Sequence, residues 1–581
     1  MAGLFLVSTR DRDFAESALA GARRQFALHG FSGLSEHAWP GWRLIHAPFI
    51  IGGPESLLAR GDDLVAVAGT LSCDGQFGQP ALEALLAMAD APDWSRIGGQ
   101  FVALVRAQGR TRLFTDFFGA FQLFHDAERR VFSTSLLSAI EALPNVSFDP
   151  QGVYEFAFNV VPVGDDTVFA ELKMLGPDRV AELSPDGVRL HDAAKPLPEA
   201  TSEMPLLDRL AIHRDRLLSV VGPYAQAFEG RIFCPISGGL DSRLALAALK
   251  ACGVMPSLYV YGGAESADVR IGREIAAGEG AAIEWLDKEG WREVAPDAFP
   301  DQVEANFHAY DGLPNYGELF ENGANAFARE ARHQDGALSV SGGCGEVYRN
   351  FFFLPDRPLS AAAVARTFFA RYARSDVTAA FDERAFLRGI EDKMLAALGR
   401  PGFRGKLPRA LIEQVYPRVR CRALFGREIS LEARYGPYLM PFLDHRVAAE
   451  AARLPLALKN AGRFEAALLN AISPRLASYP SAYGHDFTGP PGAAHRRAEF
   501  LTRIRPTMLR RYSYALRRRM GPVADEHGGL LSPDYMGRVV DLDFPAMRRF
   551  FRTGRIGDSG MMRRIANLEY LAAKLGSKLA P

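Results

Sequence analysis

The sequence predicts an α/β protein with two parts, a unit of short β-strands over residues 1–190 and a larger unit over residues 206–581. Three observations support this fold class. Short alternating strands with glycine turns fill the first part, buried strand–loop–helix units in series follow, and a mostly helical pattern begins near Arg357. Such units in series are typical of a doubly wound parallel sheet, which binds its ligand at the carboxyl ends of its strands.

The strands of the first part include Ile97–Leu104, Arg112–Gly119 and Val131–Ser135. The segment His191–Pro205 is rich in alanine, proline, glutamate and serine, which predicts a linker between the two parts. In the helical last part, the pattern is expected to break at Pro401, Pro408 and Pro417.

A glycine-rich turn between the predicted strand Arg231–Ile236 and a run of helix formers is the clearest sign of function. Its residues are Ser237, Gly238, Gly239, Leu240, Asp241 and Ser242. Glycines let the backbone approach a ligand, and the next helix offers phosphate its free N–H groups and positive dipole end. The Asp241 carboxylate suits a magnesium ion that bridges phosphate oxygens. Because no Gly-Lys-Ser/Thr follows, we interpret this as a pyrophosphate-binding loop, with a plain glycine turn as the alternative.

Two further glycine turns follow predicted strands. One comes after Ala337–Val340 and spans Ser341–Glu346, whose last residue offers a second carboxylate for a metal. The other ends the strand Leu258–Gly263 and precedes Asp268 at the start of a helix. Because parallel strands present their carboxyl ends at one edge, we expect these turns to close around one nucleotide.

In these turns and their order, the sequence resembles the asparagine synthetase family, whose synthetase domain has S-G-G-L-D-S, a later S-G-x-G-x-D-E and an E-x-R-x-P-F-L-D segment. The last of these resembles Glu432–Asp444, slightly lengthened, where Glu432 and Arg434 are either a structural ion pair or direct participants. Residues 1–190 resemble the family's glutaminase domain, a β-sandwich of the N-terminal-nucleophile type. The resemblance implies an ATP-pyrophosphatase fold for the second part, with ATP and Mg²⁺ bound there.

The chemistry of a glutaminase is missing from the first part. A glutaminase of this type needs a cysteine directly after the initiator methionine, whereas this chain begins Met1-Ala2. The family's asparagine–glycine oxyanion element corresponds to Ala68-Gly69, which lacks the amide side chain, and Cys73 cannot supply an N-terminal amine. We therefore expect no glutamine hydrolysis.

Relatives without that cysteine include β-lactam synthetases and lasso-peptide cyclases, which use an amine of the substrate itself. This chain most resembles a lasso-peptide cyclase, a macrolactam synthetase. That resemblance implies a ligase that adenylates a side-chain carboxylate of a precursor peptide and joins it to the peptide's N-terminal amine. A leader-removing protease is then the expected protein partner. A β-lactam-type or other small-molecule amide synthetase and a non-catalytic nucleotide-binding regulator stay as alternatives.

The resemblance assigns roles to the residues of the three turns. Asp241 and Glu346 would hold the metal. The nucleotide would be held by Ser237, Gly238, Gly239, Leu240, Asp241, Ser242, Val260, Gly262, Asp268, Ser341 and Gly342.

The expected catalytic residues are Glu346, Arg463, Lys459 and His485. In asparagine and β-lactam synthetases a lysine meets the phosphate and the developing oxyanion, but the matching position here holds Glu465. Arg463 or Lys459 is expected to replace that lysine. His485, beside Asp486, is either a proton carrier with an orienting carboxylate or a loop histidine with a hydrogen-bonded neighbour.

Composition fits a soluble globular protein with 48% hydrophobic and 23% charged residues and a formal net charge of zero. The five scattered cysteines show neither zinc nor disulfide spacing, which favours a reducing cytoplasm. No signal peptide or membrane-spanning run is evident, so we expect no membrane partner. An arginine-rich stretch at residues 503–519 contains tyrosines, but with zero net charge a solvated helix is favoured over a nucleic-acid site.

Overall fold

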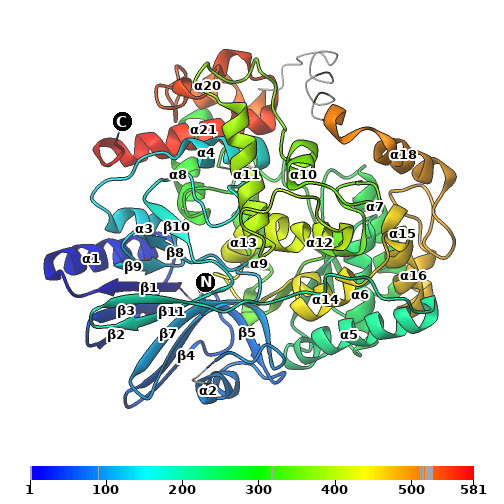
Figure 1. Cartoon of the computed structure of the whole chain (residues 1–581), viewed down its shortest axis with the longest axis horizontal. Coiled ribbons are helices and arrows are strands. Elements are labelled where there is room, and N and C mark those ends of the chain that lie inside the picture. The colour runs from blue at the N-terminus through cyan, green and yellow to red at the C-terminus, as the bar shows by residue number, and fades with distance from the viewer. Residues whose placement is uncertain are drawn as a thin grey trace.

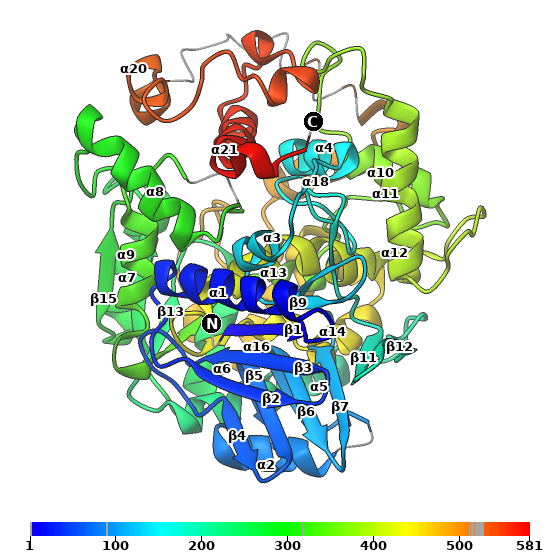
Figure 2. The same cartoon turned by 90° about the vertical axis from the view of Figure 1, so that its left-hand side faces the viewer.

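The computed structural model describes residues 3–88, 91–315, 319–510, 512, 516 and 528–580. The fold is α/β, as predicted, with two antiparallel sheets toward the N-terminus, a parallel sheet after them and a helical last part. Figures 1 and 2 show the antiparallel sheets at one end of the molecule and the last helices at the other.

The two antiparallel sheets each have six strands within the described residues and pack on one another. The first has the order β10 (Leu172–Met174), β8 (Phe124–Asp126), β9 (Val131–Ser133), β1 (Gly3–Ser8), β3 (Trp42–Ala47) and β2 (Ser35–Trp39). The second has the order β12 (Gly187–Asp192), β11 (Arg179–Ser184), β7 (Arg110–Thr115), β6 (Ile97–Ala107), β5 (Asp63–Cys73) and β4 (Leu57–Arg60).

Helices cover both outer faces of this sandwich (Figure 2). On one side lie α1 (Arg12–Leu28) and α3 (Leu136–Ala142), and on the other lies α2 (Gln79–Ala87). Alternation along β5 explains the layers, because Ala66 faces the first sheet whereas Val65 and Val67 face α2. The predicted strands at residues 97–104, 112–119 and 131–135 are confirmed as β6, β7 and β9.

The parallel sheet has the order β15 (Ile283–Leu286), β14 (Ser257–Tyr261), β13 (Ile232–Pro235), β16 (Leu338–Val340) and β17 (Tyr438–Leu439). The chain starts in the middle strand, winds outward to β15, and then returns to the other side of β13. The helices that accompany these strands are α5 (Leu206–Ala227), α6 (Leu240–Ala251), α7 (Ala267–Glu279), α8 (Phe299–Ala309) and α9 (Ala324–Ala331). The predicted doubly wound sheet is thereby confirmed.

The rest of the chain is mostly helical. Its helices are α10 (Ala361–Phe368), α11 (Glu383–Ala397), α12 (Arg409–Glu413), α13 (Arg422–Glu432), α14 (His445–Ala452), α15 (Leu456–Lys459), α16 (Arg463–Ile472), α17 (Pro474–Ser478), α18 (Ala493–Ile504), α20 (Pro533–Met536) and α21 (Ser559–Leu575). None of the helices in the described ranges has the length and apolar character needed to cross a membrane.

The prediction that Pro417 breaks a helix is wrong. Pro417 lies in a π-helical segment, Tyr416–Cys421. A short turn connects this segment to α12, and its other end runs directly into α13. Proline has no N–H to donate to the preceding turn, so a locally wider helix accommodates it without ending the run. This turn brings Tyr416 to the functional site described below.

The last helices return to the N-terminal part. Helix α21 packs on α4 (Pro150–Asn159), as Figure 2 shows, and the backbone N–H of Val146 donates to Lys578 O. The last strand of the sandwich ends at Asp192, and α5 begins at Leu206. The predicted linker is therefore irregular, except for its first two residues, which lie in β12. The division into residues 1–190 and 206–581 stays a prediction.

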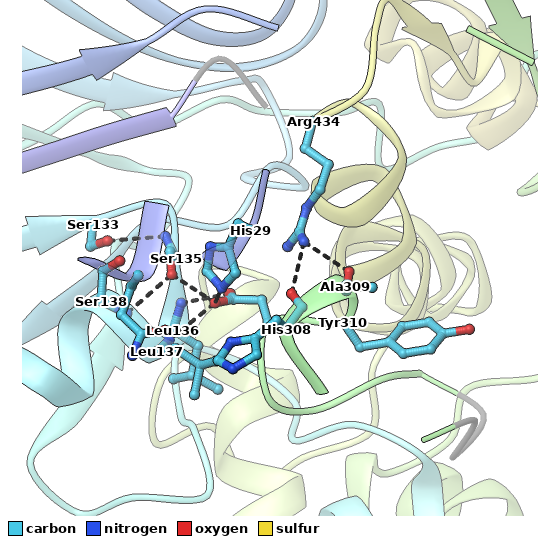
Figure 3. Close-up of polar contacts among 12 residues, drawn as sticks. His29, Ser133, Ser135, Leu136, Leu137, Ser138, His308, Ala309, Tyr310 and Arg434 are labelled. Carbon is cyan, nitrogen blue, oxygen red and sulfur yellow. Dashed lines mark hydrogen bonds and ion pairs between the residues drawn. The ribbon is translucent and has the colours of Figure 1, made fainter. Parts of the chain in front are cut away.

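A buried polar junction joins the sandwich to the second part (Figure 3). The Asp311 carboxylate accepts hydrogen bonds from Ser135 Oγ (2.6 Å) and Leu136 N (2.7 Å) at the start of α3. His29, directly after α1, places Nε2 3.5 Å from the same carboxylate and has no exposed side-chain surface. Burial lowers the pKa of His29 to about 3, so this imidazole is neutral in the folded protein.

We expect this neutral histidine to make the fold acid-sensitive. The pKa of His29 is about 3 when folded and 6.5 in the reference state, so the unfolded chain binds more protons between these values. Stability from His29 is complete above pH 6.5 and is lost as the pH falls toward 3, by up to about 5 kcal/mol. Urea titrations from pH 7 to 4 should show a smaller slope in His29→Gln than in wild type. Equal slopes in the two proteins would contradict the assignment.

Candidate functional site

Two loops meet where the winding of the parallel sheet reverses. The Ser237–Ser242 loop follows β13 and the Ser341–Glu346 loop follows β16, and these strands are neighbours. Ligands of doubly wound sheets bind at this point, outside the carboxyl ends of the strands.

The first loop is held by its own side chains. Ser242 Oγ accepts a hydrogen bond from Ser237 N (3.1 Å) and lies 2.9 Å from Ser237 Oγ. Ser237 Oγ also accepts from Gly239 N at 3.2 Å. Gly239 precedes α6 without a side-chain cap, so the first turn of that helix faces the loop. The predicted strand, glycine turn and helix are all present.

Glycine is required where the two loops touch. A Cβ atom on Gly342 would lie 2.9 Å from Ser242 N, and one on Gly238 would lie 2.8 Å from the Ala482 side chain. A Cβ on Gly345 would overlap the Asp241 carboxylate. Between these glycines Cys344 has a φ of 68°, a left-handed conformation that is uncommon outside glycine. The loop thus keeps a glycine-like turn at the position where the sequence has cysteine.

Arg349 links the carboxylates of the site. Its Nε donates to Glu465 Oε2 at 2.6 Å, and its Nη2 forms an ion pair with Asp241 Oδ1. The Glu465 side chain is fully buried, whereas a quarter of the Asp241 side chain is exposed. Burial raises the pKa of Asp241 well above its usual value; Arg349 opposes this rise, and the charge of Glu465 adds to it.

Glu346 is a second carboxylate beside this pair. Tyr416 OH donates to its Oε2 at 2.6 Å. Burial raises the pKa of Glu346, and the nearby negative charge of Asp241 raises it further. The site therefore holds more negative charge than Arg349 neutralises.

A cavity of about 430 Å³ opens beside these groups. Leu240, Glu346 and Arg349 form the wall nearest the two loops, and α18 supplies part of the opposite wall. The cavity is mainly apolar and aromatic, with Phe351, Phe353, Tyr483, Phe487 and His495 among its lining residues. Its size is within the range of ligand-binding pockets.

The structure places the predicted nucleotide-binding residues in two groups. The two loops face each other, and Ser341 belongs to this first group, its Oγ accepting from Gly343 N at 3.0 Å. The second group lies at the end of β14, where Val260 is buried and Gly262 N donates to Leu286 O. Asp268 joins the groups, because its carboxylate accepts from Gly238 N at 2.8 Å.

Neither residue proposed to replace the family lysine reaches the carboxylates. Lys459 Nζ donates to Glu413 Oε2 at 2.8 Å, and its side chain is only 3% exposed. Burial lowers the pKa of Lys459, while Glu413 opposes that shift. Arg463 begins α16 and is exposed. The cation beside Asp241 is Arg349, which sequence reasoning missed although a buried carboxylate at position 465 requires a partner.

His485 lines the cavity, but Asp486 does not orient it. Thr488 donates to the Asp486 carboxylate through both N (3.0 Å) and Oγ1 (2.8 Å). His485 Nδ1 lies 3.2 Å from Tyr483 O, and its ring centroid is 5.8 Å from that of His495. The hypothesis of a histidine with an orienting carboxylate is therefore wrong in its second part, because the short Asp486–Thr488 turn uses that carboxylate.

Glu432 and Arg434 do not pair with each other. Glu432 accepts from Arg332 Nη2 at 2.7 Å and from Arg329 Nε at 3.0 Å, inside a buried network. Arg434 donates to the carbonyl oxygens of His308 and Ala309, at the junction in Figure 3. The contacts of both residues are structural. This agrees with the alternative of a structural role, although Glu432 and Arg434 bind other partners and not each other.

We expect Glu432→Gln to destabilise the fold strongly. It would remove the carboxylate that both Arg329 and Arg332 contact, and breaking a buried ion pair costs about 3–5 kcal/mol. Glu83→Gln breaks an ion pair with Arg60 in which both side chains are about half exposed, and it should change stability by less than ~1 kcal/mol. Urea denaturation of both variants measures the difference. Equal stability losses would show that the network contributes no more than a surface pair.

The residues of the site fit a phosphate ligand with a divalent cation. Hydroxyl groups and the first turn of α6 face the loop, and hard cations such as Mg²⁺ are bound by one or two carboxylates plus phosphate oxygens. Burial raises the pKa values of Asp241 and Glu346, neighbouring carboxylates raise them further, and a bound cation would oppose both shifts. Within the described ranges, no group of three or more His, Cys, Asp or Glu side chains is arranged to hold a metal by itself.

The space beside Gly69 in the sandwich, the position expected for the oxyanion element of a glutaminase, is filled. Thr70 Oγ1 accepts a hydrogen bond from Tyr438 N at 2.9 Å, and Gly69 packs against Phe121. The space beside Gly69 and Thr70 is only about 10 Å³. Met1 and Ala2, which bear on the missing nucleophile, lie outside the described residues.

No protein-family model and no curated protein matches the chain. One similar solved structure is titled as the allosteric regulatory enzyme of purine biosynthesis (TM-score 0.24, 8% identity, 49% of this chain and 80% of that one). Another is glutamine phosphoribosylpyrophosphate amidotransferase from B. subtilis with ADP and GMP (TM-score 0.22, 10% identity, 50% and 91%). Similarity at these TM-scores supports no conclusion about fold or activity.

Proposed function

We propose that this protein is an ATP- and magnesium-dependent, AMP-forming amide ligase that closes a macrolactam in a precursor peptide, as a lasso-peptide cyclase does. One observation supports this most: the loops of β13 and β16 bring Asp241 near enough to Glu346 for its charge to raise the pKa of Glu346, and Glu346 lines a cavity of about 430 Å³. This supports a phosphate-binding role for the first loop, with two carboxylates and a cavity beside it.

The proposed reaction has two steps. A carboxylate oxygen of the peptide attacks the α-phosphorus of ATP, and pyrophosphate leaves. The N-terminal amine of the peptide then attacks the acyl carbon, AMP leaves with the former carboxylate oxygen, and a proton passes from the nitrogen to a base. The peptide loses one water in total. Mg²⁺, held by Asp241 and phosphate oxygens, would neutralise charge on the leaving pyrophosphate.

Glu346 is the favoured base. It lines the cavity, and burial raises its pKa above the ordinary value for glutamate, which makes it a stronger proton acceptor. The apolar walls would hold amine and acyl group together, a positioning effect of about 7–11 kcal/mol in favourable cases. A protease that exposes the amine is the proposed partner.

The small space beside Gly69 and Thr70 supports an amine that comes from the substrate itself. Thr70 Oγ1 accepts a hydrogen bond from Tyr438 N, and the space of about 10 Å³ beside it is too small for glutamine. A β-lactam-type or other small-molecule amide synthetase is the second candidate. The cavity volume of about 430 Å³ favours it, since that volume holds a drug-sized ligand more readily than a long peptide.

Mass spectrometry of small peptides tests the proposal in the cells that make this protein. Cells with the wild-type protein should contain a compact peptide that cells with Asp241→Ala lack, and the variant cells should accumulate a species heavier by one water. Loss of a small metabolite with unchanged peptides would favour the second candidate. If peptides and metabolites are both unchanged, the protein is not a ligase, and a nucleotide-binding regulator becomes the better account.

A further inference from the structure

The environment of Arg349 differs from that of an ordinary ion pair. The guanidinium contacts Glu465 through Nε at 2.6 Å and reaches Asp241 through Nη2. Its side chain is 20% exposed and lines the cavity, whereas Glu465 is fully buried. One end of the guanidinium is therefore fixed in the protein, and the other faces the predicted phosphate loop.

We propose that Arg349 is the phosphate-binding cation of this site, and that Glu465 positions it there. This inference rests on the proposed adenylation reaction. Glu465 lies on α16, whereas Arg349 directly follows the short helical turn Gly345–Tyr348 after the second loop. These two separate elements together hold a cation beside Asp241.

The geometry favours Arg349 over the other cations near the loops. Lys459 is bound to Glu413 away from the cavity wall, and Arg463 is exposed on α16. Arginine also suits this role chemically, because its planar fork can donate to a carboxylate on one edge and to phosphate oxygens on another.

Two states follow from these contacts. Without nucleotide, Arg349 forms an ion pair with Asp241 and so competes with a metal ion for that carboxylate. With magnesium and ATP, Nη2 can leave Asp241 for a phosphate oxygen while Nε stays on Glu465. Arg349 would thus weaken the binding of a metal ion alone and strengthen the binding of the metal–nucleotide complex.

The test uses the double variant Arg349→Met/Glu465→Gln in the full-length protein. Removing Arg349 alone would leave Glu465 buried without a partner and endanger folding. The double change keeps the formal charge of the cluster and replaces both side chains by neutral ones of similar size. Arg404→Met, the same arginine change in an exposed ion pair with Asp392, is the control. Circular dichroism melts first establish that all three proteins fold.

Calorimetry then measures two affinities in each protein, for Mn²⁺ alone as a magnesium probe and for ATP with excess Mg²⁺. In the double variant we expect ATP with Mg²⁺ to bind about 10- to 100-fold more weakly, the effect of losing a charge-assisted hydrogen bond. Mn²⁺ alone should bind several-fold more tightly, because Asp241 is released. The control should match wild type in both.

Opposite shifts in the two affinities support the inference, since damage to the fold would weaken both. If wild type binds ATP with Mg²⁺ and the double variant binds it equally well, Arg349 is not the phosphate cation, and the proposed function stands without it. If wild type itself does not bind ATP with Mg²⁺, the proposed function fails and this inference fails with it. The two failures are therefore distinguishable.

Discussion

Asp241→Asn is expected to abolish AMP formation while leaving the protein as stable as wild type or more so. Asparagine keeps the size of the side chain but removes the negative charge that would hold magnesium. Metal-assisted charge stabilisation contributes several kcal/mol, so turnover should fall by ~10³-fold or more. Chromatographic measurement of AMP release by purified protein gives the activity.

The stability part of this prediction follows from the sign of the pKa shift. The folded pKa of Asp241 is raised above 3.8, so the folded protein binds more protons than the unfolded chain just above that pH. The ionised carboxylate therefore costs stability at neutral pH, and asparagine removes this cost. Thermal melts of Asp241→Asn should show an unchanged or higher midpoint. Asp297→Asn, at an exposed ion pair with Arg538, should change neither activity nor midpoint. An active Asp241→Asn protein would rule out magnesium binding by this carboxylate.

Glu346→Gln has the second-largest expected effect, and it falls on ring closure alone. Glutamine can still accept the hydrogen bond from Tyr416 but cannot take a proton from the amine. Loss of a general base lowers a rate by about 10²–10⁴-fold. Exchange of labelled pyrophosphate into ATP, which reports adenylation only, should stay within about tenfold of wild type. If exchange is lost together with product, Glu346 binds the metal and is not the base.

The pH profile provides a control for this role. The carboxylate must be ionised to act, so activity should decline as the pH falls through the raised pKa of Glu346. The hydrogen bond from Tyr416 stabilises the ionised form and lowers that pKa. Tyr416→Phe should therefore move the acidic limb of the profile to higher pH. An unmoved limb would mean that another group controls it.

The architecture was predictable because it depends on local patterns. Each of the loops after β13 and β16 follows an apolar run and contains glycines, and those features alone predict a strand and a close approach of the backbone. The short strands β15 and β17 were missed, since four and two residues carry no usable periodicity. They are defined by pairing with β14 and β16.

The partners of charged residues were not predictable in the same way. Arg349 and Glu465 are 116 positions apart, and Lys459 and Glu413 are 46 apart, so their pairing depends on how helices pack. One signal was present. A glutamate at a buried position needs a cation, and Arg349 comes shortly after the Ser341–Glu346 loop. His495 and the rest of the α18 wall had no such signal, because α18 is distant in sequence from both loops.

The most direct test of the central claim is reconstitution with purified protein. Small peptides from cells with Asp241→Ala are mixed with wild-type protein, ATP and Mg²⁺, and both peptide mass and nucleotide products are followed. We predict that one peptide becomes lighter by one water. AMP and pyrophosphate should each appear in the same molar amount as this product. Release of ADP, or AMP release without any loss of water from a peptide, would contradict a ring-closing amide ligase.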